Sequence, residues 1–482
     1  MTEHIKGRLF GGAILLLEFG LLFAYGFEGL LFDEPTDAFA NSVINFLYFA
    51  TLILAVLGFG LQLSYFQSTG LTAIFQSLFV VSLTTIFLPP MMQFWYNVYI
   101  GSFDGTIGTS TNSFLLFNRY HDHDETEFQA SFFYMRITLF CCLSQLVALH
   151  AFFGKINLLA TLLFSFIFQC GWVFTFYLCI SIARNSPADI IYDDYLAANV
   201  YVFGSIFGVV LAAILPKPDS NHEEARATRI STILALVGTF FVFASFACST
   251  FFFPQRLLVA LGTTSFFGFN AGTMNMFFAM SASMISSLVI TLLVSQRVNI
   301  RVVIWASIMG AILFSSVGNT ADNITIPIST GFVAGIISGI FIEVINPKIN
   351  RNSIFDSYGL LGTFLVNSIL AAFFIAPLVL IGMTNTGANF LSLGNVALSN
   401  RDQAGWVLIY FALSLGFGAV TAAGAGLFIR CLSSGEREDD LLDFKIFDND
   451  YGLYDDPEQV RGEKIRSRDN IESGDAIGNR QL

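Results

Sequence analysis

Twelve apolar runs of membrane-spanning length follow one another along this chain of 482 residues. A helix needs about 20 consecutive apolar residues to cross the hydrocarbon core of a bilayer. The runs are continuously apolar and lack the alternation of barrel strands, so we predict an all-α polytopic membrane protein with twelve transmembrane helices. The predicted spans cover residues 9–32, 43–66, 71–96, 129–152, 157–183, 195–215, 229–252, 273–294, 302–318, 326–346, 359–384 and 405–431.

The composition supports this class and excludes several others. Charged residues make up 12% of the chain, whereas a soluble domain carries about 25%. The shortage excludes a disordered protein, a nucleic-acid-binding protein and an ordinary soluble enzyme, and it predicts the lipid bilayer as a partner. One further apolar stretch, residues 253–272, contains Pro254 and three glycines. We expect it to form a re-entrant or surface-lying loop rather than a thirteenth span.

The distribution of Lys and Arg in the short loops predicts the orientation. If the N-terminus is cytoplasmic, eleven of these residues fall inside and four outside, as the positive-inside rule requires. An even number of spans then places the C-terminus inside as well. The sequence does not indicate which cellular membrane holds the protein.

The chain divides into two parts by composition. Residues 1–432 contain the apolar runs, and residues 433–482 form an acidic tail with fourteen acidic and seven basic residues. About −7 of the formal net charge of −12 therefore lies in this tail, which we expect to be cytoplasmic. Two interpretations of the tail stay open: a solvated, mobile end, or a segment that docks on basic cytoplasmic loops of its own or a neighbouring subunit.

Ionisable residues inside the predicted spans are few, and such residues are functional candidates because they are costly in a bilayer. For Glu18 and Arg136 an inter-helix or inter-subunit contact and a transport role both stay open. Of five histidines only His150 is near a span, at the inner end of the fourth, so we expect no histidine in mid-membrane. No nucleotide-binding loop, nucleophile elbow or metal-ligand set is present in the sequence. We therefore predict a protein that is not an enzyme, with no cofactor and no metal.

Several segments, in order, resemble the Rhesus (Rh) branch of the ammonium transporter superfamily. They include HAFFGKINLLATLL between the fourth and fifth spans, the F-G-x-x-F-G core of Phe203 to Gly208, INPKINRNSIFDSYG before the eleventh span and FKIFDNDYGLYDDPEQ in the tail. The similarity covers roughly residues 9–460. It implies two inverted five-helix repeats after one extra N-terminal helix, a pore between the two halves, and a trimer that is either homomeric or formed with related subunits.

The resemblance also implies site residues. In conducting members ammonium passes a pair of stacked phenylalanines and then an apolar pore bearing two facing histidines. Phe140 and Phe241 fall on the two gate phenylalanines, whereas Tyr201 and Phe364 fall on the two pore histidines.

Two carboxylates accompany these positions. Asp193 and Asp356 each fall on an aspartate that lies eight residues before a pore histidine in the family. We expect such carboxylates to lie at helix ends, where they can cap an N-terminus.

The replacement of both pore histidines leaves two functions open. A phenol and a benzene ring cannot reproduce a proton relay between two imidazoles near neutral pH. One hypothesis is a channel of the ammonium transporter family for ammonia, ammonium or a small neutral gas such as carbon dioxide. The other is a non-conducting homologue that acts as a structural trimer subunit or membrane anchor, a role attributed to the blood-group Rh polypeptides, which carry the same two replacements.

Overall fold

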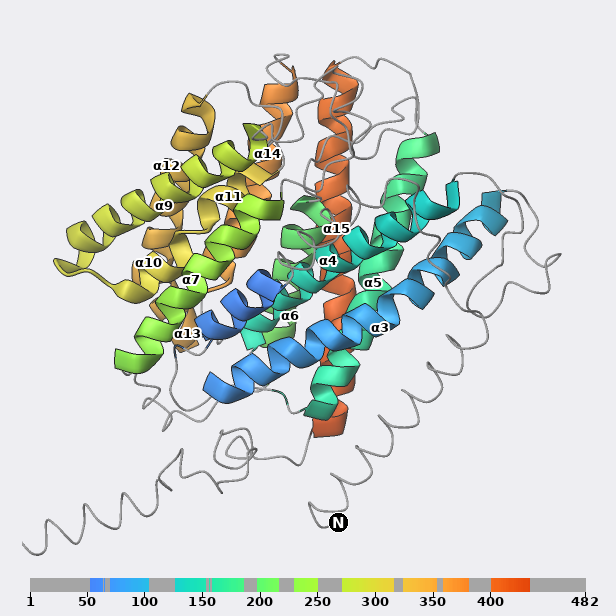
Figure 1. Ribbon diagram of the computed structural model, residues 1–482, viewed down its shortest axis with the longest axis horizontal. Coiled ribbons are helices and arrows are strands. Elements are labelled where there is room, and N and C mark those ends of the chain that lie inside the picture. Colours follow the sequence, from blue (N-terminus) through green and yellow to red (C-terminus); the bar gives the residue numbers. More distant parts are fainter. Residues whose placement is uncertain are drawn as a thin grey trace, which may run out of the picture.

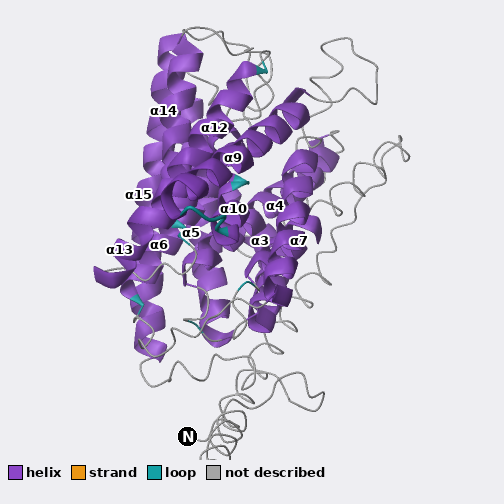
Figure 2. Ribbon diagram, turned by 90° about the vertical axis from the view of Figure 1, so that its left-hand side faces the viewer, coloured by secondary structure: helices purple, strands orange, loops and turns teal. Residues whose placement is uncertain are grey.

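The computed structural model of the chain is a bundle of tilted helices (Figure 1). It describes residues 53–63, 65, 70–103, 126–152, 156, 158–185, 197–215, 229–249, 271–315, 324–352, 359–380 and 400–433. Within these ranges all regular secondary structure is helical (Figure 2). The predicted all-α class is therefore confirmed.

The helices lie where the apolar runs predict them. Eleven apolar helical segments coincide with the second to the twelfth predicted span, and five of them are long and apolar enough to cross a membrane by themselves. The first predicted span and residues 253–270 of the predicted loop lie outside the described residues, and the last two residues of that loop begin α9. After the helix Ile53–Leu63, the elements are α3 (Gly70–Phe103), α4 (Thr126–Phe152), α5 (Leu158–Asn185), η2 (Ala198–Val202), α6 (Phe203–Ile214), α7 (Arg229–Ser249), α9 (Ala271–Ser295), α10 (Ile300–Ala306), α11 (Met309–Phe314), α12 (Thr325–Ile340), η6 (Phe341–Ile345), α13 (Asn346–Asn352), η7 (Leu361–Leu365), α14 (Val366–Leu380) and α15 (Asn400–Ser433).

The bundle has two halves that meet at a pair of glycines. The first helix of each half contains a similar hexapeptide, ILAVLG at 53–58 and ILALVG at 233–238. A Cβ atom on Gly58 would lie 2.9 Å from the carbonyl oxygen of Gly238, and one on Gly238 would lie 2.6 Å from the carbonyl oxygen of Gly58. This reciprocal contact is the arrangement expected where a two-fold relation between repeats brings two equivalent helices together.

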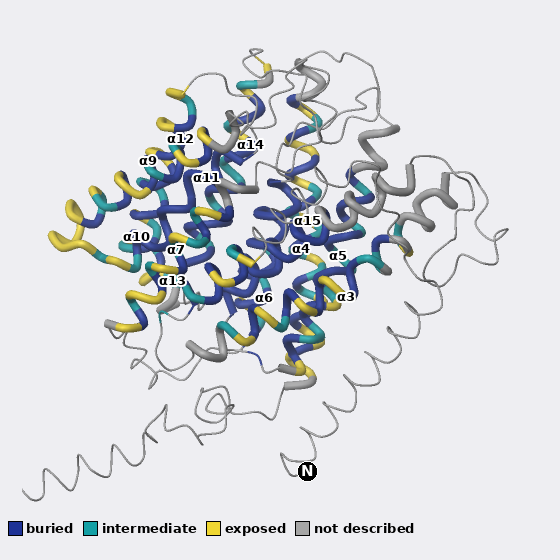
Figure 3. Tube along the Cα trace, in the orientation of Figure 1, coloured by how far each residue is buried: buried dark blue, intermediate teal, exposed yellow. Residues whose placement is uncertain are grey.

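One long helix joins the two halves. Helix α15 has 34 residues, so it is about 50 Å long and exceeds the roughly 30 Å of a bilayer core. It packs against α5 and α6 of the first half and α14 of the second (Figure 1). Buried residues are concentrated along α4, α6 and α11, in the middle of the bundle (Figure 3).

The first half is packed by large aromatic side chains. The rings of Phe164, Phe168 and Phe207 lie within 4.8–5.7 Å of one another, measured between centroids. All three side chains are buried. Edge-to-face contacts of this kind fill the space between α5 and α6.

The second half is packed by small residues. Gly310 of α11 and Gly331 of α12 both lie against the carbonyl oxygen of Ala279 in α9, and Gly335 lies against Ser283. Because these positions lack side chains, the three helix backbones approach closely, as small residues allow in membrane bundles.

Candidate pore site between the two halves

The two residues that the resemblance places on the family's pore histidines lie in two matching irregular turns. Tyr201 belongs to the π-helical turn η2 before α6, and Phe364 belongs to the π-helical turn η7 before α14. The two turns pack against each other. Gly359, with a φ of 78°, precedes η7 and provides the left-handed backbone at its start. Single π-helical turns are often found at functional sites, and this pair marks the interface between the halves.

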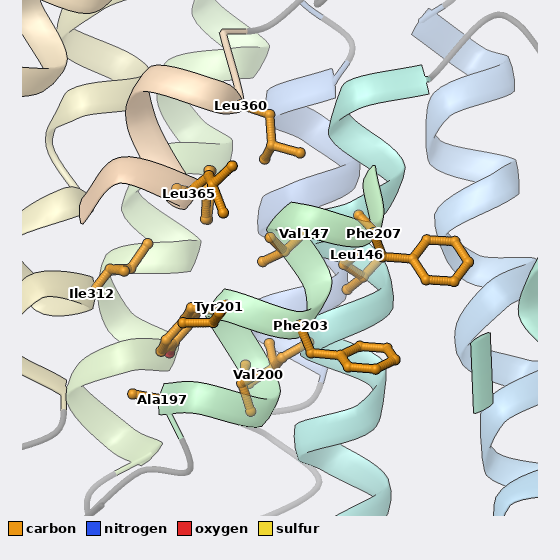
Figure 4. Close-up of a cluster of buried hydrophobic side chains, with 14 of the residues drawn as sticks. Leu146, Val147, Ala197, Val200, Tyr201, Phe203, Phe207, Ile312, Leu360 and Leu365 are labelled. Carbon is orange, nitrogen blue, oxygen red and sulfur yellow. The ribbon is translucent and has the colours of Figure 1, made fainter. Parts of the chain in front are cut away.

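Apolar side chains occupy this interface. Tyr201 has 5% of its surface exposed and Phe364 has 1%. Figure 4 shows Tyr201 of η2 in the same buried cluster as Ile312 of α11, Leu365 and Val147. All five side chains are buried in one apolar core.

A histidine lies in contact with Phe364. The ring of His150, from α4, is 5.7 Å from that of Phe364 and 5.1 Å from those of Phe59 and Trp305, measured between centroids. His150 is fully buried. Phe59 and His150 belong to the first half, and Trp305 and Phe364 belong to the second. The four rings, which we call the His150 cluster, therefore join four spans across the interface.

The hydrogen bond of the His150 ring identifies its neutral tautomer. Nδ1 lies 2.6 Å from the carbonyl oxygen of Leu146, one turn earlier in α4. A carbonyl oxygen only accepts, so Nδ1 donates and carries the proton. In the neutral ring Nε2 is then the nitrogen with a lone pair.

The sequence places His150 at the inner end of the fourth predicted span and does not relate it to Phe364. The structure brings the two rings into contact, since packing between tilted helices sets the level at which they cross. The expectation of no histidine in mid-membrane stays a prediction. His150 is the one histidine within a predicted span, and an ionisable residue in a span is a candidate functional residue.

The turn η2 is fixed by polar contacts with three other helices. The carbonyl oxygen of Asn199 accepts hydrogen bonds from Ser144 Oγ at 3.1 Å and Trp172 Nε1 at 2.8 Å. Its side-chain oxygen accepts one from Ser414 Oγ of α15 at 2.9 Å. A π-helical turn leaves a carbonyl outside the regular helical pattern, and these donors satisfy it in the bilayer interior.

Of the four remaining predicted site residues, the structure describes the two phenylalanines. Phe140 is buried on α4 with 7% of its surface exposed, and Phe241 is half-buried on α7. Their role as a gate stays a prediction. Asp193 and Asp356 lie outside the described residues.

The chain matches no family model and no curated protein by sequence. Solved structures are similar in fold. Rh50 of Nitrosomonas europaea, of the Rhesus protein family of channels, has a TM-score of 0.61 and 15% sequence identity, covering 90% of this chain and 97% of Rh50. The chain has the Rh and Amt/Mep fold. A sensor Amt protein gives a TM-score of 0.57 at 14% identity, covering 83% of this chain and 97% of that one, and Mep2 of Candida albicans gives 0.56 at 12%, covering 81% and 83%.

The likeness confirms the predicted fold class of an integral membrane protein. Rh50, the neighbour with the highest of these three scores, belongs to a family of channels rather than of enzymes. The apolar helices and the two halves of this chain agree with that architecture.

Proposed function

We propose that the protein is a channel of the Rh type that passes neutral ammonia rather than the ammonium ion. The observation that carries this proposal is the lining of the interface between the halves, where Tyr201, Phe364 and their neighbours present apolar, buried side chains. A bare cation is costly in such surroundings, whereas a small uncharged molecule is not. Carbon dioxide is a second solute of the same class.

The proposed route uses the predicted residues in order. Phe140 and Phe241 form the outer gate, and the solute then passes between Tyr201 and Phe364. Asp193 and Asp356 precede the two irregular turns in sequence and stabilise the helix starts. The replacement of the family's histidine pair by Tyr201 and Phe364 removes the proton relay, which is the reason for assigning the neutral species.

Stopped-flow measurement on proteoliposomes tests the proposal. An inwardly directed ammonium gradient should raise the internal pH faster than in empty vesicles, because entering ammonia takes up a proton. The rate should not depend on membrane potential, since no charge crosses. A rate equal to that of empty vesicles would reject conduction, and a potential-dependent rate would reject the neutral species.

A pair of substitutions examines the replaced histidines. The double variant Tyr201→His, Phe364→His should raise the flux and make it respond to membrane potential, because titratable nitrogens are restored on both sides of the interface. A matched control is Phe168→His, which puts a histidine in the aromatic core of the first half, away from the interface. The control should show no gain.

A second candidate function is a non-conducting structural subunit. The near-complete burial of Tyr201 and Phe364, at 5% and 1% exposure, favours it. Native flux equal to that of empty vesicles, from protein that reconstitutes intact, is the result that selects this function.

We also propose a trimer in the membrane, homomeric or with related subunits, with both termini in the cytoplasm and the tail 433–482 available to a cytoplasmic partner. The fold and the positive-inside distribution support these assignments. Cross-linking in native membranes, followed by mass measurement, tests the trimer. Protease access to the tail in sealed vesicles of known orientation tests the topology.

A further inference from the structure

We propose that a cavity at one end of the contact between the two halves binds the headgroup of an anionic phospholipid from the cytoplasmic leaflet. The cavity, which we call the Arg297 cavity, has a volume of about 370 Å³, and its lining includes Tyr65, Thr232, Ser295 and Asn299. The proposal goes beyond the channel, since it does not depend on which solute crosses the membrane. It uses the proposed topology, in which the loop of Arg297 is cytoplasmic.

Segments of both halves form the Arg297 cavity. Tyr65 lies two residues after the first helix of the first half, and its backbone nitrogen bonds Gln62 O at 3.2 Å. The side chain of Gln62 in turn bonds Thr239 of α7 in the second half. The other lining residues belong to α7 and to the chain between the end of α9 and the start of α10. A headgroup bound here therefore contacts both halves and should stabilise their association.

The polar lining offers hydrogen-bond donors to a phosphate group. The guanidinium of Arg297 carries a positive charge and a planar set of N–H donors that matches phosphate oxygens. Tyr65, Thr232 and Ser295 each add a hydroxyl group. Helix α7 begins at Arg229, one turn before Thr232, which brings a second positive charge to this end of the helix. Among the described residues, none that lines the cavity is acidic.

The turn that carries Arg297 has a defined shape. Gln296 has a φ of 55°, which is uncommon for a residue other than glycine, and its nitrogen bonds a carbonyl of the last turn of α9 at 3.1 Å. The side chain of Asn299 accepts a hydrogen bond from Arg301 N at 3.2 Å and donates one to Glu343 Oε1 at 2.9 Å. Because the turn is already fixed, a ligand has little backbone to order when it binds.

Exposed apolar side chains continue from the cavity along the neighbouring helices. Leu293 of α9 and Ile230 of α7 expose 73% and 72% of their surface, and Val298 on the cavity wall exposes 49%. A basic cavity beside an apolar surface matches an amphiphile, whose headgroup enters the cavity while its acyl chains lie along the helices. Basic pockets between helices on the cytoplasmic side are typical sites for anionic lipid headgroups. A free phosphate ion would leave the apolar surface unused.

Titration of the purified full-length protein with phosphatidylinositol in detergent tests the site, with native mass spectrometry to count the lipid molecules bound per chain. Phosphatidylcholine with the same acyl chains is the reference, because its headgroup has a phosphate but no net charge. We expect the first phosphatidylinositol to bind more tightly than the first phosphatidylcholine. Arg297→Gln should weaken phosphatidylinositol binding about fivefold, the effect of one basic residue at an anionic leaflet, and leave phosphatidylcholine binding unchanged.

Two further variants separate the site from general charge. Arg430→Gln removes the same charge from the last turn of α15, at an exposed position that does not line the cavity. It should retain the native affinity for phosphatidylinositol. Arg297→Lys keeps the positive charge and should retain most of the affinity. Arg297 is exposed, so all three variants should unfold at the native midpoint when no lipid is added.

The outcomes decide between the possible occupants. A loss of phosphatidylinositol binding in Arg297→Gln that is absent in Arg430→Gln supports the site. An equal loss in both variants, or equal native affinities for the two lipids, overturns it. Displacement of the lipid by inorganic phosphate at the same concentration would assign the cavity to a soluble anion instead. A change in the number of chains per particle in Arg297→Gln, with lipid binding unchanged, would assign this face to a second copy of the chain.

The lipid site and the channel can fail separately. Ammonia flux equal to that of empty vesicles rejects the channel, whereas the site is decided by lipid binding to the protein in detergent. Native flux together with equal affinities for the two lipids retains the channel and overturns the site.

Discussion

The two halves of the bundle share one helical arrangement but are packed by different side chains. In the first half, rings such as Phe164, Phe168 and Phe207 fill the space between helices. In the second half, Gly310 and Gly331 let α11 and α12 approach the backbone of α9. Close backbones also occur in the first half, where Gly204 and Gly208 of α6 lie against carbonyl oxygens of α4. The first half thus adds ring packing to close backbones, whereas the contacts of α9 with α11 and α12 rely on the glycines. Substitutions at the two kinds of contact should therefore differ in the size of their effect.

The largest effect is expected from Gly331→Leu in the second half. A side chain there meets the backbone of Ala279, and a helix backbone held on both sides cannot move away. We expect a loss of at least about 3 kcal/mol of stability, seen as a lowered midpoint of thermal unfolding in detergent. The control is Gly424→Leu on α15, where a Cβ meets nothing within 4 Å. Equal midpoints for the two variants would contradict packing by close backbones.

An intermediate effect is expected from Trp172→Phe in the first half. The change keeps an aromatic ring stacked on Phe176, at 5.7 Å between centroids, but removes the donor to Asn199 O. Since Ser144 still donates to this carbonyl, we expect a cost of about 1 kcal/mol. Thermal unfolding measures it, with the same change at the half-buried Trp95, Trp95→Phe, as the control. A Trp172→Phe midpoint equal to that of the native protein would show that the turn η2 does not depend on this donor.

Much of the fold could be predicted because hydropathy is a local property. The eleven apolar helical segments coincide with apolar runs, and in a bilayer such runs form helices because their backbone groups must be hydrogen-bonded internally. The hexapeptides that end at Gly58 and Gly238 are similar in sequence. A similarity of six residues is too short to predict a repeat by itself, and its significance follows from the contact between the two helices.

The site could be predicted less well, because it depends on relations between helices. The resemblance identified Tyr201 and Phe364, whose two turns pack together. It did not reveal His150, since the apolar residues of α4 are distributed around the helix and no periodicity in its sequence shows which face meets the second half. The π-helical turns were missed for a similar reason: donors from Ser144 and Trp172, distant in sequence, satisfy the carbonyl that the turn η2 exposes.

The smallest effect is expected at the contact between the halves themselves. Gln62 Nε2 donates to Thr239 Oγ1 at 3.2 Å, one turn beyond the crossing of Gly58 and Gly238. Hydrogen bonds between membrane helices contribute about 0.6 kcal/mol on average, so Thr239→Val should lower the stability by about that amount. Thr330→Val is the matched control, because the Thr330 hydroxyl bonds carbonyls of its own helix, Ile326 and Pro327.

A double-mutant cycle isolates this contact. Thr239→Val and Gln62→Leu should be less than additive by about the same 0.6 kcal/mol, whereas Thr330→Val and Gln62→Leu should be additive. A coupling energy of zero for the first pair would show that the hydrogen bond does not stabilise this contact, which would then depend on the close approach of the two glycines. In that case the interface that contains Tyr201, Phe364 and His150 is held by the close approach of backbones, as are α9, α11 and α12.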